Sequence, residues 1–219
     1  MSKRKESTDF DIVSQQFLSF RNLEDHIGII NTVNTYHCRQ NEIGDTTDHV
    51  KYSTYKQIFN TLQRKEEYTI LLVDDSMLTL HYVFNQDRSL KGQTLSFFPN
   101  YRNNTSSGDI ENSEDADVDD KKTFEKLSNY IRIDYTEVGR QEYIHTLVHL
   151  HVGVFKESIR FPLQHFLYPY EFLFLIFKYL YNRPDDELQI LECNTAKESK
   201  LTEAERRKIE QKIGYFKRN

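Results

Sequence analysis

Residues 130–181 read YIRIDYTEVGRQEYIHTLVHLHVGVFKESIRFPLQHFLYPYEFLFLIFKYLY, and this stretch decides the fold. It contains three runs in which apolar and polar side chains alternate, as they do along half-buried β-strands. In the clearest run, residues 145–154, the even positions are apolar after Thr146, and three of the odd positions are histidines. The run predicts a strand with one apolar face and one face that carries imidazoles.

The two neighbouring runs alternate in the same way. In residues 130–135 isoleucines alternate with an arginine and an aspartate, and in residues 158–161 Ile159 and Phe161 alternate with an arginine. If the three runs are adjacent strands of one sheet, their polar positions share a face. This face is our candidate site, and its members are Arg132, Asp134, His145, His149, His151 and Arg160.

The rest of the chain places this unit between helices. Period-2 patterns predict further strands at 68–73, 77–84 and 93–98, with a loop through 87–92. Residues 22–38 are ambiguous, and we expect a mixture of helix and strand there. Apolar stripes at helical spacing predict helices from a cap at Thr8 or Asp9, and at 48–65, near 124–127, and at 168–181, 185–193 and 202–216. The order predicts an α+β protein with an antiparallel sheet of about six strands, an N-terminal helical layer and C-terminal helices on the even-numbered face of the histidine strand.

Length and composition indicate a single domain over residues 1–219. Within it we expect a disordered tail at 1–7, an acidic mobile loop at 103–122 and a C-terminal helical extension at 183–219. Residues 103–120 hold seven carboxylates and no Lys or Arg, so the formal net charge of −5 becomes +2 for the remainder of the chain. A segment of that composition buries too little apolar area to offset the entropy lost on ordering.

Several classes of protein are disfavoured by the residues that are missing. Two cysteines are too few for a disulfide framework, no signal peptide is visible, and no apolar run reaches the length of a membrane span. We therefore expect a cytoplasmic protein without membrane contact. There is no Walker loop, G-x-G-x-x-G or G-x-S-x-G motif, which counts against an ordinary nucleotide-dependent enzyme.

A series of short motifs gives the chain a resemblance. Asp74-Asp75-Ser76, Y-I-R-I-D-Y at 130–135, H-x-x-x-H-L-H at 145–151, I-R-F-P at 159–162 and P-x-x-F at 169–172 occur in this order. The chain resembles a bacterial domain-of-unknown-function family of about this length, over residues 45–181 or more. The family's pattern has glycine where this chain has Asp75 and proline where it has Thr146. The resemblance implies a compact domain, found with mobile elements or phage-defence genes, and it implies no reaction.

The first chemistry that suits the histidine face is metal binding. Same-face residues at i and i+2 of a strand lie about 6.6–7 Å apart, so His149 and His151 can converge on one ion, with zinc as an example. Asp134 or His145 would be the third ligand, and His145 reaches the ion only if its strand bends. No cofactor is required by the sequence, and H-x-H alone is a weak signal.

Two other interpretations remain open. In the second, Arg132 and Arg160 hold phosphate groups, Tyr130 or Tyr143 offers a stacking surface, and His149, His151 and Asp134 serve as ligands or as acid–base groups of a phosphodiesterase or nuclease. In the third, both faces of the sheet are covered and the polar side chains form a satisfied buried network under the terminal helices.

The aromatic helix at 168–181 concerns partners rather than chemistry. Its apolar side chains surround most of its circumference, so we expect core burial, with part of the surface available to another subunit. The leading hypothesis is a cytoplasmic bacterial accessory protein that works through a protein partner or self-association, in antiviral defence or a mobile-element system. The alternative is a hydrolase of phosphodiesters or a nucleic-acid-binding protein that uses the histidine face.

Overall fold

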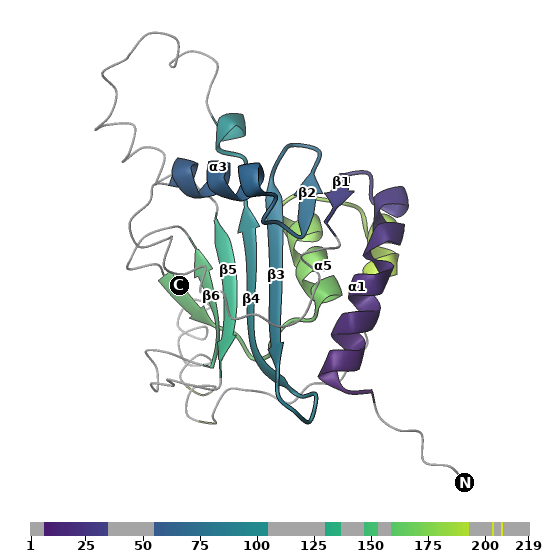
Figure 1. Cartoon of the computed structure of the whole chain (residues 1–219), viewed down its shortest axis with the longest axis vertical. Helices are drawn as coiled ribbons and strands as arrows, with labels where there is room; N and C mark the ends of the chain where they lie inside the picture. Colours follow the sequence, from purple (N-terminus) through teal and green to yellow (C-terminus); the bar gives the residue numbers. More distant parts are fainter. Residues whose placement is uncertain are drawn as a thin grey trace, which may run out of the picture.

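A seven-stranded antiparallel sheet with the order β1-β2-β3-β4-β5-β6-β7 forms the centre of the protein (Figure 1). The computed structural model describes residues 7–34, 55–104, 130–136, 147–152 and 159–192, together with Glu203 and Arg207. The strands are β1 (Ile30–Val33), β2 (Ile70–Leu72), β3 (Met77–Phe84), β4 (Leu90–Phe98), β5 (Ile131–Thr136), β6 (Val148–Val152) and β7 (Ile159–Pro162). Each strand pairs with the next one along the chain, so the predicted α+β class and antiparallel sheet are confirmed.

In the ambiguous region 22–38, the described residues 22–34 form the end of a helix followed by a strand at Ile30–Val33. Helix α1 (Asp9–His26) ends as Ile27 turns to an extended conformation, and β1 then pairs with β2. Strand β1 is therefore a seventh strand, in addition to the six that the alternating patterns predict. At four residues it is too short to show a period.

Strand β4 starts earlier than predicted, because the turn before it is tighter than a loop through 87–92. The turn is closed by bonds between Asn85 and Ser89, including Asn85 N–H to the Ser89 carbonyl at 2.9 Å, and Arg88 takes the left-handed conformation with φ 71°. Leu90 is buried and pairs opposite Phe84, and a bulge separates this pair from the next one, Val83 and Gly92.

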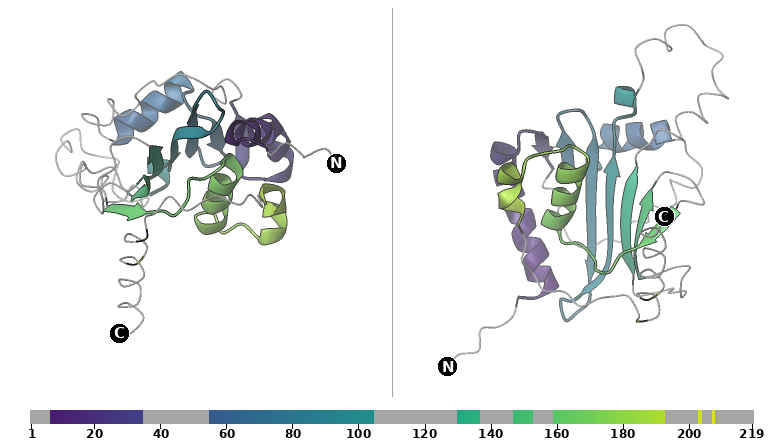
Figure 2. Two further views of the ribbon diagram at one scale, coloured as in Figure 1. Left: turned by 90° about the horizontal axis from the view of Figure 1, so that it is seen from below. Right: turned by 180° about the vertical axis from the view of Figure 1, so that it is seen from behind.

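The helices divide between the two faces of the sheet. Figure 2 shows α3 (Tyr55–Lys65) on one side, and α5 (Pro169–Tyr179) and α6 (Asp185–Leu188) on the other, with α1 beside them. The C-terminal helices therefore pack on the face of Val148 and Leu150, as predicted. The predicted N-terminal layer is split, since α1 shares the large core with α5 whereas α3 covers the opposite face. Short 3-10 turns follow at Tyr101–Asn104 and Gln189–Leu191, and the second shortens the helix predicted at 185–193.

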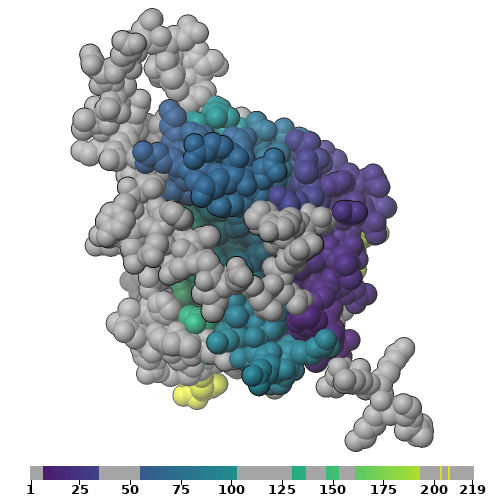
Figure 3. Space-filling view, viewed as in Figure 1, coloured from purple at the N-terminus to yellow at the C-terminus, as the bar shows by residue number. Residues whose placement is uncertain are grey.

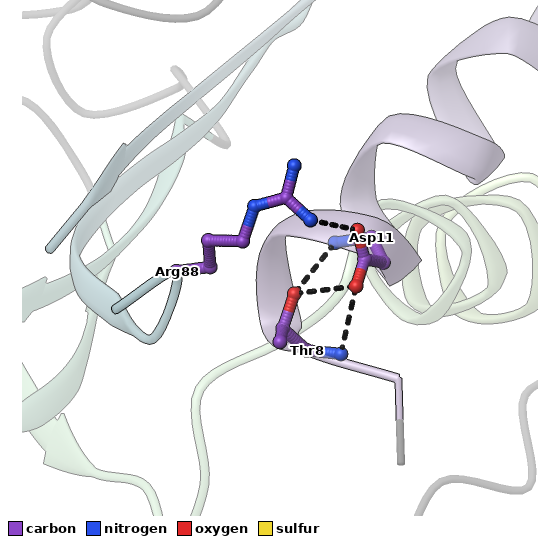
Figure 4. Close-up of polar contacts among 3 residues, drawn as sticks. All are labelled: Thr8, Asp11 and Arg88. Atoms are coloured by element: carbon purple, nitrogen blue, oxygen red, sulfur yellow. Dashed lines mark hydrogen bonds and ion pairs between the residues drawn. The ribbon is translucent and has the colours of Figure 1, made fainter. Parts of the chain in front are cut away.

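The start of α1 is fastened to the β3–β4 turn (Figure 4). Thr8 caps the helix, since the Asp11 N–H donates to the Thr8 hydroxyl and the Asp11 carboxylate accepts from the Thr8 N–H. Arg88 donates to the same carboxylate at 2.9 Å. The capping box satisfies backbone N–H groups that have no partner within the helix, and the bond from Arg88 joins the helix to the sheet.

The Asp74-Asp75-Ser76 segment is a turn, as predicted from its residue types. The Ser76 N–H and hydroxyl donate to the two Asp74 carboxylate oxygens at 3.0 Å, and the Tyr181 hydroxyl donates to Asp74 Oδ2 at 2.9 Å. The Asn100 N–H donates to the buried Ser76 hydroxyl at 2.9 Å. These bonds connect the β2–β3 turn to the ends of β4 and α5, so the segment serves the fold.

Asp75 lies in this turn with φ 64°, the left-handed region in which glycine is least strained. We expect Asp75→Gly to keep the free energy of unfolding within about 1 kcal/mol of the wild type, because relief of strain offsets the larger unfolded-state entropy of glycine. Asp75→Val should lower it by about 1–2 kcal/mol, because a β-branched side chain is strained there. Urea unfolding of both variants is the measurement, and equal stabilities would contradict the expectation.

Gln93 is a polar residue on the apolar face of the sheet, opposite Tyr82 and Tyr135. It is 3% exposed, and within the described residues neither atom of its amide has a hydrogen-bond partner. Because an unsatisfied buried polar group costs about 1–3 kcal/mol, Gln93→Met should raise the free energy of unfolding by about 1 kcal/mol. Gln189→Met, at an exposed position, is the matched control and should change little. A loss of stability in Gln93→Met alone would show that the amide is satisfied.

Several predictions fall outside the described residues. They are the tail at 1–7 apart from Ser7, nearly all of the acidic loop at 103–122, the helix near 124–127, and the helix at 202–216 except Glu203 and Arg207, which are helical. The C-terminal extension at 183–219 is described only to residue 192 and at these two positions. In the described part, no helix has both the length and the apolar character needed to cross a bilayer.

Candidate metal centre on the histidine face

The sheet register brings four of the predicted site residues together. Strand β6 pairs with β5 so that His149 lies opposite Asp134 and His151 lies opposite Arg132. Directly opposite residues of an antiparallel pair point to the same face, with Cβ atoms about 4.5–5.5 Å apart. The alternation in the two strands therefore places these four side chains in one cluster, which we call the histidine cluster.

Distances within the histidine cluster are short around one oxygen. Asp134 Oδ2 lies 2.8 Å from Arg132 Nε, 3.2 Å from His151 Nε2 and 3.8 Å from His149 Nε2. The two imidazole rings are 4.6 Å apart between centroids. One ligand atom from each of Asp134, His149 and His151 lies within 4.8 Å of the others. The carboxylate is thus the common partner of the cluster.

The charges of this cluster favour an ionised carboxylate. Burial raises the pKa of Asp134, but the hydrogen bond from His151 and the charges of Arg132, His151 and His149 together lower it by more, so the pKa lies below its ordinary value. Burial also lowers the pKa of Arg132, and Asp134 and Tyr130 together more than reverse this change. A negative charge therefore sits beside two imidazoles, as metal ligation requires.

Tyr130 supports the Arg132 guanidinium and also hydrogen-bonds with Ser96. Burial raises the pKa of the Tyr130 hydroxyl, while hydrogen bonds with Ser96 and Arg132 act in the opposite direction. Tyr130 is buried and packs on Phe98, with ring centroids 4.9 Å apart. It is therefore a wall of the cluster, and the open stacking surface that the sequence suggested at this position is wrong.

The histidines of the cluster are buried, whereas the ion pair is partly exposed. His149 and His151 are 2% and 3% exposed, whereas the side chains of Arg132 and Asp134 are 20% and 18% exposed. Helix α3 lies at the surface in Figure 3. Its buried side chains share a core with Met77, Phe98 and Tyr130 at one end of this face. Helices α5 and α6 lie on the opposite face. The third predicted terminal helix, at 202–216, lies outside the described residues except for Glu203 and Arg207, so the buried-network hypothesis stays a prediction.

Two predicted site residues are not placed in the cluster. His145 lies outside the described residues, as does Tyr143. The backbone of Arg160 pairs opposite His151, which puts the residue in the correct register, but its side chain is not described.

The polar face extends beyond the predicted site to residues that the sequence reasoning did not single out. His81 lies opposite Thr94, and Thr94 lies opposite Asp134. Thr79 and Ser96 form the adjacent row, which leads to Arg132. The signal was present in β3, whose apolar positions 78, 80, 82 and 84 alternate with Thr79 and His81.

The chain matches one family in comparisons with known proteins, and the match covers residues 18–213. It belongs to the family described as Uncharacterized conserved protein (DUF2290). No curated protein and no solved structure matches the chain. Membership in DUF2290 confirms the resemblance to a domain-of-unknown-function family and assigns no reaction.

The donor set of this DUF2290 protein suits a transition-metal ion. Two ligand atoms bonded at about 2.0–2.2 Å to a tetrahedral ion lie about 3.3–3.6 Å apart. The Asp134–His151 and Asp134–His149 separations of 3.2 and 3.8 Å bracket that value. Two imidazoles and one carboxylate are also the ligand types of catalytic zinc sites, which keep a fourth position for water. The residues present therefore fit zinc, and Arg132 beside Asp134 matches an outer partner that orients a ligand.

His81 provides a pH dependence that is separate from the histidine cluster. Burial lowers its pKa from the ordinary 6.5, so the folded protein favours the neutral imidazole. The unfolded chain binds the proton more tightly, and stability should fall as the pH drops below about 6.5, until the folded pKa is passed. In urea unfolding at pH 7.5 and pH 5.5, we expect a smaller decrease for His81→Gln than for the wild type. Equal decreases would assign the pH dependence to other groups.

Proposed function

We propose that this DUF2290 protein is a metal-dependent hydrolase of phosphodiesters, with Asp134, His149 and His151 as the metal ligands. The observation that carries the proposal is the approach of three ligand atoms within 4.8 Å on the face of one sheet. A metal ion in such a site acidifies a bound water and polarises a phosphoryl oxygen. Zinc is the first choice, because imidazole nitrogen and carboxylate oxygen are both common zinc ligands.

Arg132 has two roles in this proposal. Its Nε donates to Asp134 at 2.8 Å, which holds the carboxylate in place. A guanidinium has five N–H donors, and a fifth of this side chain is exposed, so part of it can donate to a phosphate oxygen beside the ion. Arg160, opposite His151 in the register, is the proposed second phosphate contact.

The test starts from protein stripped with a chelator and dialysed. Isothermal titration with zinc and with manganese should give one site per chain. His149→Ala and His151→Ala should each weaken metal binding at least about 100-fold, because mutation of residues that only hydrogen-bond to a ligand already weakens it about 10–100-fold. His26→Ala, at an exposed position on α1, is the control and should bind as the wild type does. Absence of a site in the wild type would overturn the metal centre.

The hydrolase is tested separately on bis(p-nitrophenyl) phosphate. We expect release of p-nitrophenol by the metal-loaded wild type, loss of this activity after chelation, and recovery on addition of the metal. Arg132→Gln should lower kcat/KM about 10–100-fold while the protein still binds metal. If the protein binds metal stoichiometrically but hydrolyses no phosphodiester, the metal site stands and the hydrolase proposal is refuted.

We also propose that the protein is a cytoplasmic bacterial accessory subunit in a defence or mobile-element system and that it self-associates. In the described part of the sheet β7 is the last strand, and Phe161 on β7 and Val152 on β6 are exposed apolar residues of one face. An edge strand of this kind can pair with its copy in an antiparallel dimer. Light scattering of the wild type should give twice the monomer mass, and Phe161→Glu should lower the fraction of dimer. A wild type that stays monomeric at high concentration would exclude self-association. Full protection against phage by His149→Ala would separate the defence role from the metal centre.

A further inference from the structure

The histidine cluster is one end of a polar band that crosses four strands. His81, Thr94, Asp134 and His149 are directly opposite one another on β3, β4, β5 and β6. A second row runs beside it through Thr79, Ser96, Arg132 and His151. Both rows point to the face on which α3 packs, at the Met77, Phe98 and Tyr130 end. The band is therefore larger than the three ligands need.

The dimensions of the band suit an extended substrate. Neighbouring strands lie about 4.8 Å apart, so the row from His81 to His149 spans about 14 Å, and the two rows lie about 7 Å apart. His81 is two strands, about 10 Å, from Asp134. This separation is too large for His81 to contact a phosphate held at the ligands. It suits a group attached to that phosphate.

The chemistry of the far end suits nucleotide groups. The Thr94 hydroxyl and the His81 imidazole can each donate and accept hydrogen bonds, and an imidazole also stacks on bases. His81 is half-buried, and within the described residues its ring nitrogens have no hydrogen-bond partner. Burial lowers the pKa of His81, so the ring is neutral at neutral pH and contributes no phosphate charge contact.

The charge of the band disfavours a duplex. Among the described side chains of the two rows, Arg132 is the single cation, and it is already paired with Asp134. Duplex binding without sequence preference draws on many Lys and Arg contacts to phosphates. Single strands are instead held by stacking and by hydrogen bonds to exposed base edges.

We propose that His81 and Thr94 form a subsite for the nucleotide next to the scissile phosphodiester, so that the substrate is a single-stranded oligonucleotide lying across β3–β6. This inference rests on the proposed phosphodiester hydrolase and names its substrate class. His81 and Thr94 are then specificity residues, and the ligands Asp134, His149 and His151 hold the reacting group.

The test compares a small substrate with an extended one. On a fluorescent single-stranded hexathymidylate, His81→Ala should raise KM at least about 10-fold with kcat within about twofold, and Thr94→Val should act in the same direction. On bis(p-nitrophenyl) phosphate, which lacks a neighbouring nucleotide, both variants should match the wild type. Thr32→Val, at an exposed position of β1, is the control for the threonine change. Equal losses on both substrates, or no loss on the oligonucleotide, would overturn the subsite.

A binding measurement separates this inference from the proposed function. Fluorescence anisotropy with the zinc-loaded protein should show at least about 10-fold weaker binding of hexathymidylate by His81→Ala, and at least about 10-fold weaker binding of the corresponding duplex by the wild type. If the wild type binds the single strand and hydrolyses nothing, the hydrolase fails while the subsite stands. Loss of zinc stoichiometry in His81→Ala, or equal affinity for duplex and single strand, would refute the subsite.

Discussion

Replacing Asp134 by alanine should lower the free energy of unfolding by about 3 kcal/mol, because it leaves the Arg132 guanidinium in a largely buried position without its counter-ion. Removing one partner of a completely buried ion pair costs about 3–5 kcal/mol. We expect the lower end of this range, because about a fifth of each side chain is exposed to solvent. His151 also loses the carboxylate that lies 3.2 Å from its Nε2. Urea unfolding of metal-free protein at pH 7.5 is the measurement.

A second variant separates the loss of the charge partner from the loss of packing. In Arg132→Met/Asp134→Leu both charges are replaced by apolar side chains of similar size, so no unpaired ion remains. Such replacements of a buried pair are often neutral or stabilising. The double variant should therefore be clearly more stable than Asp134→Ala. If the two are equally unstable, the ion pair is not the source of the effect.

Acid adds an independent check on Asp134. Because the folded protein holds its pKa below the ordinary 3.8, the carboxylate contributes stability above that value and loses the contribution as the pH falls through the folded pKa. The stability difference between the wild type and Asp134→Ala should therefore shrink as the pH falls below about 3.8. A difference that stays constant from pH 7 to pH 2 would contradict the ionic explanation.

The sequence was informative where side-chain alternation decides a face. Ile131, Ile133, Val148 and Leu150 turn to the core of α1 and α5, and Arg132, Asp134, His149 and His151 turn the other way, as the period of two requires. Because each of these strands pairs with the next one along the chain, the meander brought the two polar runs side by side. The cluster followed from pattern and order alone.

Other features depend on contacts that alternation does not contain. The burial of the histidine cluster depends on contacts between distant segments. Tyr130, beside the cluster, packs on Phe98 and on the core of α3, and the alternation in its own strand does not predict this. Strand β1 is too short for a period and exists because it pairs with β2. His81 was overlooked because its strand was judged by its apolar face, although the same alternation placed it on the polar one.

The aromatic helix α5 supplies the second large effect, and Phe172→Ala should lower the free energy of unfolding by about 3–5 kcal/mol. Phe172 is 0% exposed and belongs with Leu173, Ile176 and Phe177 to the core that α5 shares with α1 and the sheet. Removing the ring loses its transfer free energy and leaves a cavity, since Pro169 and the cap at Tyr168 hold the start of the helix in place. Phe161→Ala is the matched control.

Phe161 is 48% exposed, so the same substitution there should cost less than about 1 kcal/mol in dilute, monomeric protein. The comparison of Phe172→Ala with Phe161→Ala tests which aromatic side chains belong to the core and which to the surface. Composition alone does not distinguish them. On α5 itself, Tyr179 is exposed where the helix ends, although Ile176 and Phe177 in the preceding turn are buried. Tyr179→Ala should therefore behave as Phe161→Ala does in dilute, monomeric protein. If Tyr179→Ala destabilises the protein as strongly as Phe172→Ala, the end of α5 is covered in solution, and self-association would have to include that surface.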